Sequence, residues 1–204
     1  MQKLQSSITN MVLVLVGVSV IMGAILAWVN NITTPAIAAI NAKNTQNAIA
    51  AVLPGIKSET IKDENATLNI GGKDYTFVLH KAMAGDEWLG TAVESTTGGF
   101  GGDLKIMVGF DKEGNILGYS LLAHTETPGL GAKADTWFQK SQKGDIIGKN
   151  PSQPLTVSKD GGEIDAITAS TITSRAFLNA VNNAYQAIAG QEADGATSAT
   201  AQKK

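Results

Sequence analysis

A run of small and hydroxyl-bearing residues at positions 168–174 carries the clearest chemical signal in this sequence. It reads Thr168, Ala169, Ser170, Thr171, Ile172, Thr173 and Ser174. It follows Asp165 and leads directly into an amphipathic segment. Hydroxyls at a helix entrance suit a phosphate, because free backbone N–H groups and the positive end of the helix dipole both face an anion there. The alternative is that Thr173 or Ser174 simply caps a helix over residues 175–188.

A second motif lies about 35 residues upstream, at positions 124–131. It reads His124, Thr125, Glu126, Thr127, Pro128, Gly129, Leu130 and Gly131. Pro128 followed by Gly129 is typical of a type II turn, in which glycine supplies the positive φ at the second central position. A glycine-rich stretch around Phe100 precedes it, and two alternating apolar segments lie between the stretch and the motif.

The composition excludes several classes of function. The 204-residue chain has a net charge of −2 and no basic cluster, which argues against a nucleic-acid surface. It contains no cysteine, so disulfides, thiolate nucleophiles and cysteine-ligated iron–sulfur clusters are excluded. His80 and His124 are the only histidines, and no zinc-binding pair can be built from them. We expect no catalytic residue and no metal site, so any electron transfer requires a bound organic cofactor.

Residues 11–29 predict a single transmembrane helix. No charged side chain occurs between Lys3 and Lys43, and this apolar run has the length that a bilayer core requires. A cleaved signal peptide is the alternative, but its apolar region is usually shorter. Trp28 resembles an interfacial anchor. With Lys3 ahead of the span, we expect residues 1–10 to be cytoplasmic and the rest of the protein to lie outside the cytoplasm, on the inner or plasma membrane.

The remaining segments predict an α+β domain, a mostly antiparallel sheet with flanking helices, preceded by the N-terminal transmembrane helix. Thr34 and Pro35 predict the start of a connector helix over residues 30–55. Alternation predicts strands at 66–70, 75–80, 88–94, 104–110, 116–122 and 164–167, with one buried face in the 104–110 strand. A short helix is expected around residues 134–139, and a longer one over residues 175–188. We expect residues 56–190 to form the domain and the small, polar residues 191–204 to be disordered.

The two motifs resemble those of one flavoprotein family, the RnfG and NqrC proteins. That family carries aspartate, two residues, serine or threonine, two small residues and threonine, and Asp165, Thr168, Ala169, Ser170 and Thr171 fill these places in order. The family usually has glycine and then alanine where this chain has Ala169 and Ser170. The segment 98–131 and the N-terminal span also resemble the family, so the resemblance covers most of the chain.

The resemblance implies a cofactor site. FMN would be attached through a phosphoester to Thr171 by a separate flavin transferase that uses FAD. Residues 168–174 would form the attachment loop, with Arg175 beside the phosphate and Asp165 read by the transferase. His124, Glu126, Thr127, Gly129 and Leu130 would lie at the flavin, with Phe100 and Leu130 against its ring. Trp88, Trp137 and Phe138 are expected in the core.

The resemblance also implies a function, with two alternatives. The chain would be an electron-relay subunit of the Rnf complex, a membrane-bound ion-translocating ferredoxin:NAD oxidoreductase, and not an enzyme alone. Its partners would be the other subunits, the transferase and the membrane. One alternative is the NqrC component of a sodium-translocating NADH:quinone oxidoreductase. The other, from a different class, is a membrane-tethered scaffold without flavin.

Overall fold

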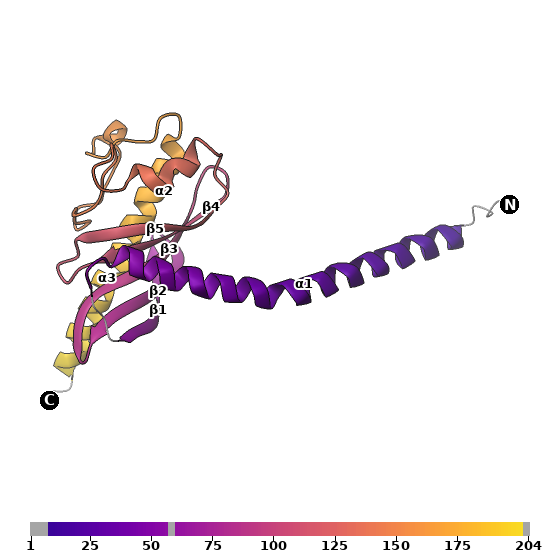
Figure 1. The fold of residues 1–204 in the computed structure, drawn as a ribbon, viewed down its shortest axis with the longest axis horizontal. Helices are drawn as coiled ribbons and strands as arrows, with labels where there is room; N and C mark the ends of the chain where they lie inside the picture. Colours follow the sequence, from indigo (N-terminus) through magenta and orange to yellow (C-terminus); the bar gives the residue numbers. More distant parts are fainter. Residues whose placement is uncertain (1–7, 57–59, 202–204) are drawn as a thin grey trace. The chain divides into compact units, whose positions relative to one another are not determined.

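The computed structural model describes residues 8–56 and 60–201, without the side chains of residue 36 and of residues 191–201. In chain order the elements are α1 (Ile8–Val52), β1 (Thr60–Ile70), β2 (Lys73–Ala84), β3 (Glu87–Gly98), β4 (Asp103–Phe110), β5 (Ile116–His124), η1 (Gly131–Lys133), α2 (Ala134–Trp137), η2 (Ser158–Asp160) and α3 (Thr171–Ala201) (Figure 1). The chain divides into two compact units between Asn44 and Thr45. The predicted α+β class with an antiparallel sheet is confirmed. The predicted tail at 191–204 lies outside the residues whose side chains are described and stays a prediction.

The first unit consists of the greater part of α1, which is long and apolar enough to cross a membrane. The break expected at Thr34 and Pro35 does not occur, because the helix continues through Pro35. A proline removes one backbone hydrogen bond from a helix. Here the Thr33 hydroxyl donates to the Val29 carbonyl at 2.9 Å and the Thr34 hydroxyl to the Asn30 carbonyl at 2.6 Å. These threonines bond carbonyls of the preceding turn instead of capping a new helix.

The second unit is built on a five-stranded sheet in which every strand pairs antiparallel with the next one in sequence. The predicted hairpins are confirmed. Gly71 and Gly72, with φ of 60° and 82°, join β1 to β2, as a two-residue hairpin turn requires. Asp111 organises the turn before β5, because its Oδ1 accepts the N–H groups of Glu113 and Asn115 at 3.0 and 2.8 Å.

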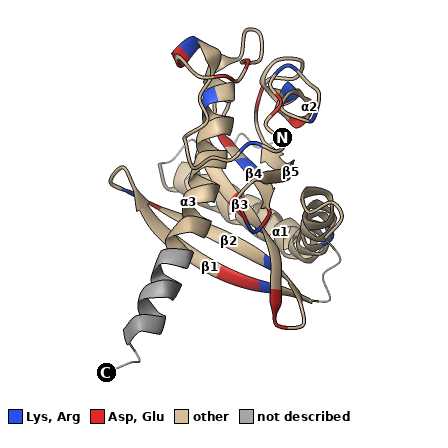
Figure 2. Ribbon diagram, turned by 90° about the vertical axis from the view of Figure 1, so that its left-hand side faces the viewer, with Lys and Arg blue, Asp and Glu red and all other residues tan. Residues whose placement is uncertain are grey.

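One face of the sheet packs against α3 and forms the main core. Phe177 of α3 stacks on Phe138 and meets the ring of Tyr119 edge-on. Leu79, Val93 and other inward side chains of the strands complete this cluster. Arg175 is the only charged residue of α3 up to residue 190, and Figure 2 shows this helix almost without charge where it lies along the sheet. Apolar packing therefore fixes the position of the helix start, which carries the hydroxyl-bearing run.

The opposite face of the sheet is also buried, which the alternation in the 104–110 strand did not predict. The last turns of α1 cover it with Ala48 and Val52, which pack on Met107. Gly109 allows this approach, because a Cβ at that position would come within 1.9 Å of the Val52 carbonyl oxygen. The apolar side chains of the strand thus lie in one of two buried clusters, one shared with α3 and the other with the end of α1.

A charged cluster shares the face covered by α1. Nδ1 of buried His80 lies 2.6 Å from Asp63, and its Nε2 lies 3.5 Å from Glu94, an ion-pair contact. Lys105 contacts the other oxygen of Glu94 at 2.7 Å. Burial lowers the pKa of His80, but the interactions with Glu94 and Asp63 outweigh it and raise the pKa above its usual 6.5. The interaction with His80, together with Lys105, lowers the pKa of Glu94 below its usual 4.5.

The segment between β5 and α3 is mostly irregular. Trp137 is partly buried and donates to the Asp165 carbonyl at 2.8 Å, and Phe138 is fully buried. The predicted strand at 164–167 is wrong, since this segment forms only a single bridge between Val157 and Ile164. The reason is local: the Ile167 N–H donates to the Ser174 hydroxyl at 2.9 Å and not to a neighbouring strand.

Candidate functional site

The hydroxyl-bearing run folds into the loop before α3 and its first turn. The helix begins at Thr171, and the Ser174 N–H donates to the Ser170 carbonyl at 3.0 Å. The alternative, in which Thr173 or Ser174 caps a helix over residues 175–188, is therefore wrong. Ser174 lies inside the first turn, and its hydroxyl donates to the Ser170 carbonyl at 2.9 Å. The N–H groups of Thr171, Ile172 and Thr173 precede the first helical bond, so this end can face an anion.

Ala169 holds the loop in a conformation that favours glycine. Its φ is 62°, and apart from Ser141 it is the only non-glycine residue with positive φ in the part of the chain that the structure describes. This is the position at which the resembling family usually has glycine. A left-handed backbone costs an alanine roughly 1–2 kcal/mol. The loop keeps its shape here despite that cost.

Glu126 connects three separate segments around the start of α3. Its Oε1 accepts the N–H groups of Phe100 and Gly101 at 2.7 and 3.3 Å, and its Oε2 accepts the Thr173 hydroxyl at 2.8 Å. The residue is only 5% exposed. It thus holds the glycine-rich loop after β3 and the loop after β5 against the first turn of α3.

Glycines make room for this carboxylate. A Cβ at Gly99 would come within 2.1 Å of Glu126 Oε1, and a Cβ at Gly131 within 2.4 Å of Oε2. Real Cβ atoms essentially never approach so closely. The glycines of the stretch around Phe100 and of the motif at 124–131 therefore allow these two loops to close on the buried side chain of Glu126.

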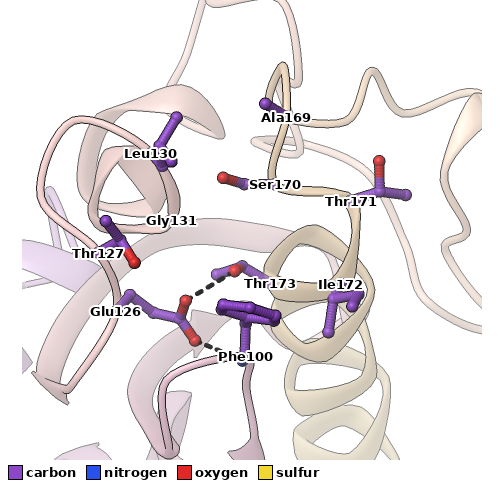
Figure 3. Close-up of a pocket in the computed structure, with 10 residues that line it drawn as sticks. All are labelled: Phe100, Glu126, Thr127, Leu130, Gly131, Ala169, Ser170, Thr171, Ile172 and Thr173. Carbon is purple, nitrogen blue, oxygen red and sulfur yellow. Dashed lines mark hydrogen bonds between the residues drawn. The ribbon is translucent and has the colours of Figure 1, made fainter.

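A pocket of about 320 Å³ opens where the three segments meet (Figure 3). This volume lies at the lower end of the range for small-molecule sites. The pocket is lined by Phe100, Glu126, Thr127, Leu130, Gly131, Ala169, Ser170, Thr171, Ile172 and Thr173. Sequence motifs some 35 residues apart thus form one site.

The pocket wall exposes apolar side chains to an unusual degree. Phe100 is 68%, Ile172 53% and Leu130 41% exposed. Among the described residues after residue 44, Ile61 is the only other large hydrophobic residue that is comparably exposed. Exposed apolar side chains gathered at one pocket are typical of a ligand or partner site. The free N–H groups of the helix start lie beside them, so the site can accept a molecule with an apolar ring and an anionic group.

Thr171 lies in the pocket wall, and Lys159 contacts its hydroxyl. Lys159 Nζ donates to Thr171 Oγ1 at 3.1 Å. Arg175, which was expected beside the phosphate, forms no hydrogen bond with this hydroxyl. Instead, its Nε and Nη2 each donate to a carboxylate oxygen of Asp160 at 2.7 Å. The guanidinium holds the pKa of the Asp160 carboxyl below its usual range.

The remaining predicted residues lie outside the pocket wall. Thr168 and Asp165 are exposed in the preceding loop, and the Ser158 hydroxyl contacts Asp165 Oδ1 at 3.4 Å. Ser174 is fully buried behind the loop. His124 is exposed at the end of β5, and its Nδ1 accepts the Glu126 N–H at 3.2 Å. Gly129 has φ 75°, as the predicted turn requires, and does not line the pocket.

Gly131, Lys159 and Asp160 are at or beside the site and were not among the predicted site residues. Gly131 belongs to the motif at 124–131, and this membership was the usable signal. Lys159 and Asp160 lie in an irregular segment without periodicity, and no pattern in the sequence places them near Thr171. In the described residues, no group of three or more histidine, aspartate and glutamate side chains could hold a metal ion.

Comparisons with known proteins agree with this geometry. Residues 99–186 match a family model described as FMN-binding domain, and every residue that lines the pocket falls within this range. The chain is 34% identical to the G subunit of the ion-translocating oxidoreductase complex of Photorhabdus laumondii over 163 residues, 76% of this chain and 78% of that protein. The corresponding protein of Shewanella amazonensis is 29% identical over 94% of this chain and 93% of its own length. The match to its Shewanella baltica counterpart is 36% identical and spans about half of each chain, 55% of both.

Proposed function

The chain belongs to the family of G subunits of ion-translocating oxidoreductase complexes, and we propose that it is the electron-relay subunit of such a complex, of the Rnf type, and carries FMN covalently on Thr171. Alone it catalyses no reaction. Its partners are the other subunits of the complex and, during maturation, a flavin transferase.

The observation that carries this proposal is the pocket beside Thr171. Its wall combines exposed apolar side chains with the free N–H groups of a helix start. An FMN molecule has the same two parts, a planar ring system and a phosphate. Phe100, Leu130 and Ile172 would lie against the ring, and the first turn of α3 would face the phosphate. The residues present therefore fit the cofactor.

The protein's own contribution is to position and retain the cofactor. FMN, when bound, supplies a carrier that accepts one or two electrons. No cysteine is present to form an alternative redox centre. Glu126 fixes the two loops against α3, and the apolar side chains of the pocket wall would cover part of the ring. Attachment to Thr171 would prevent loss of the cofactor by diffusion.

Covalent attachment is tested by producing the full chain together with an active flavin transferase. We expect a band that remains fluorescent on a denaturing gel, and an intact mass raised by FMN less one water. The Thr171→Ala variant should lose both signals, whereas Ser170→Ala, its matched control in the same loop, should keep both. A colourless wild-type protein made with an active transferase would favour the scaffold alternative.

We further propose that α1 is a single membrane anchor, with the N-terminus in the cytoplasm and the flavin domain outside. The absence of cysteine gives a direct test. A cysteine introduced at exposed position 152 (Ser152→Cys) should react with a membrane-impermeant maleimide in intact cells whose outer envelope has been made permeable. Reaction only after the inner membrane is lysed would place the domain in the cytoplasm.

A further inference from the structure

We propose that Lys159 is the cationic partner of the phosphate group on Thr171, and that Arg175 acts as a positioning residue that holds Lys159 in place through Asp160. This inference rests on the proposed attachment of FMN to Thr171. It names the residues that bind the phosphate, which neither the sequence nor the family match assigns.

The contact between Lys159 and Thr171 joins two segments that are 12 residues apart. Lys159 lies in η2, and its ammonium donates to Thr171 Oγ1 at 3.1 Å. Lys159 forms no salt bridge with the residues that the structure describes. A cation beside an acceptor hydroxyl, in contact with no carboxylate, can pair with the anion that forms there.

Arg175 and Asp160 explain how such a short segment is held. The two side chains form a bidentate pair, with both N···O distances 2.7 Å. Arg175 lies one turn into α3 after Thr171, and Asp160 directly follows Lys159. The pair therefore ties η2 to the helix that carries Thr171. Because Nε and Nη2 of the guanidinium bind this carboxylate, the role that the contacts support for Arg175 is to position η2.

Ser170 supplies a further polar side chain at the helix start. The residue is only 8% exposed, and its hydroxyl forms no hydrogen bond with any described residue. In Figure 3 this hydroxyl points across the pocket, while the Thr171 side chain points away from it. The Ser170 hydroxyl therefore faces the pocket, and Lys159 is the donor that contacts the Thr171 hydroxyl.

The chemistry of attachment gives Lys159 two roles. The Thr171 oxygen forms a bond to the FMN phosphorus of FAD, the phosphoanhydride bond of FAD breaks, AMP leaves with the bonding electrons, and the hydroxyl proton passes to a base of the transferase. A phosphodiester with one negative charge remains. Because Lys159 donates to Oγ1, the threonine proton is left free for that base, and the ammonium then offsets the charge of the product.

The experiment measures the initial rate of flavin attachment to the purified full chain in detergent, with purified transferase and FAD, by intact mass. We expect Lys159→Met to slow attachment by about tenfold, and Lys159→Arg to restore the rate to within about threefold of wild type. Arg175→Met should slow it in the same direction. Lys149→Met is the matched control, because Lys149 pairs with Glu163 away from Thr171 and its loss should leave the rate unchanged.

A second readout uses the finished product and does not depend on its activity. In the flavin-loaded protein, Lys159 should react with acetic anhydride more slowly than in the unloaded protein, as measured by peptide mass, whereas Lys149 should react equally in both. The inference is overturned if Lys159→Met is loaded at the wild-type rate and Lys159 is equally reactive in both forms. Failure of the wild-type chain to accept FMN would instead overturn the proposed function.

Discussion

Truncation of Glu126 should destabilise the protein more than any other single change in the pocket wall. The carboxylate accepts two short hydrogen bonds, from the Phe100 N–H and the Thr173 hydroxyl, and a longer one from Gly101. A hydrogen bond to a charged group contributes about 1.5–3 kcal/mol, and a buried donor left without a partner adds a cost. Phe100 is exposed enough for water to reach its N–H in part. We therefore expect Glu126→Ala to lower the free energy of unfolding by about 3 kcal/mol, and Glu126→Gln by about 1 kcal/mol.

A double-mutant cycle with Thr173→Val isolates the contact between the carboxylate and the helix start. Valine keeps the shape of threonine and removes only the hydroxyl. Alone it should cost about 1 kcal/mol, because Glu126 Oε2 loses its partner. In the Glu126→Ala background the same change should cost almost nothing, which gives a coupling of about 1 kcal/mol.

The assay is denaturant unfolding of the unloaded full chain in detergent, followed by tryptophan fluorescence. Thr127→Val is the matched control, since Thr127 is exposed in the same wall and its hydroxyl forms no hydrogen bond with the described residues. The unfolding midpoint of this variant should equal that of the wild type. If the two changes are additive within about 0.3 kcal/mol, or if Glu126→Ala costs less than about 1 kcal/mol, the carboxylate does not hold the three segments together.

Three further predictions concern the loop, the buried charges and the apolar wall. Ala169→Gly should stabilise the protein by about 0.5–1 kcal/mol, because the left-handed backbone costs alanine more than the added chain entropy costs glycine. Thermal unfolding measures this change, and Ser141→Gly, at φ 66°, should have a similar effect. Because the pKa of His80 is raised, its ion pairs stabilise the fold fully below about pH 6.5 and less as pH rises through the raised pKa. His80→Gln should therefore lower the free energy of unfolding more at about pH 5.5 than at about pH 8.5, as measured by urea unfolding. Because the pKa of Glu94 is lowered, the stability that Glu94 contributes is lost only below about pH 4.5, outside the range between these two pH values. An equal effect of His80→Gln at both pH values would contradict the role given to the His80 ion pairs. In the flavin-loaded protein, Phe100→Ser should raise iodide quenching of flavin fluorescence about twofold without changing the unfolding midpoint, since Phe100 is exposed; unchanged quenching would remove it from the ring's environment.

The sequence predicted those parts of the fold in which periodicity or turn chemistry is local. The hairpin of β4 and β5 followed from strict alternation and the Asp111 turn, and the apolar N-terminal helix from its length. The sequence did not predict which helix would cover each face of the sheet. Met107 and Gly109 read as an outer face, and only the tertiary contact with Val52 of α1 shows that they are buried.

The limits of sequence reasoning at the site have the same cause. The two motifs predicted the pocket wall because one combines glycines with hydroxyls and the other is a run of hydroxyls before a helix. Arg175 was expected beside the phosphate because it lies one turn from Thr171, but Asp160 binds its guanidinium. Lys159 contacts Thr171 only because the irregular segment folds back, and no spacing rule predicts such a contact. Pro35 likewise read as a helix start, although it lies inside α1 and the Thr34 hydroxyl bonds a carbonyl of the preceding turn.

The most direct test of the proposed attachment is peptide mapping of the protein isolated from native membranes of cells with an active flavin transferase. We expect the peptide with Thr171 to carry the mass of FMN less one water, and fragmentation to assign the addition to this residue. The same peptide found unmodified, or modified at Ser170, would contradict the proposal.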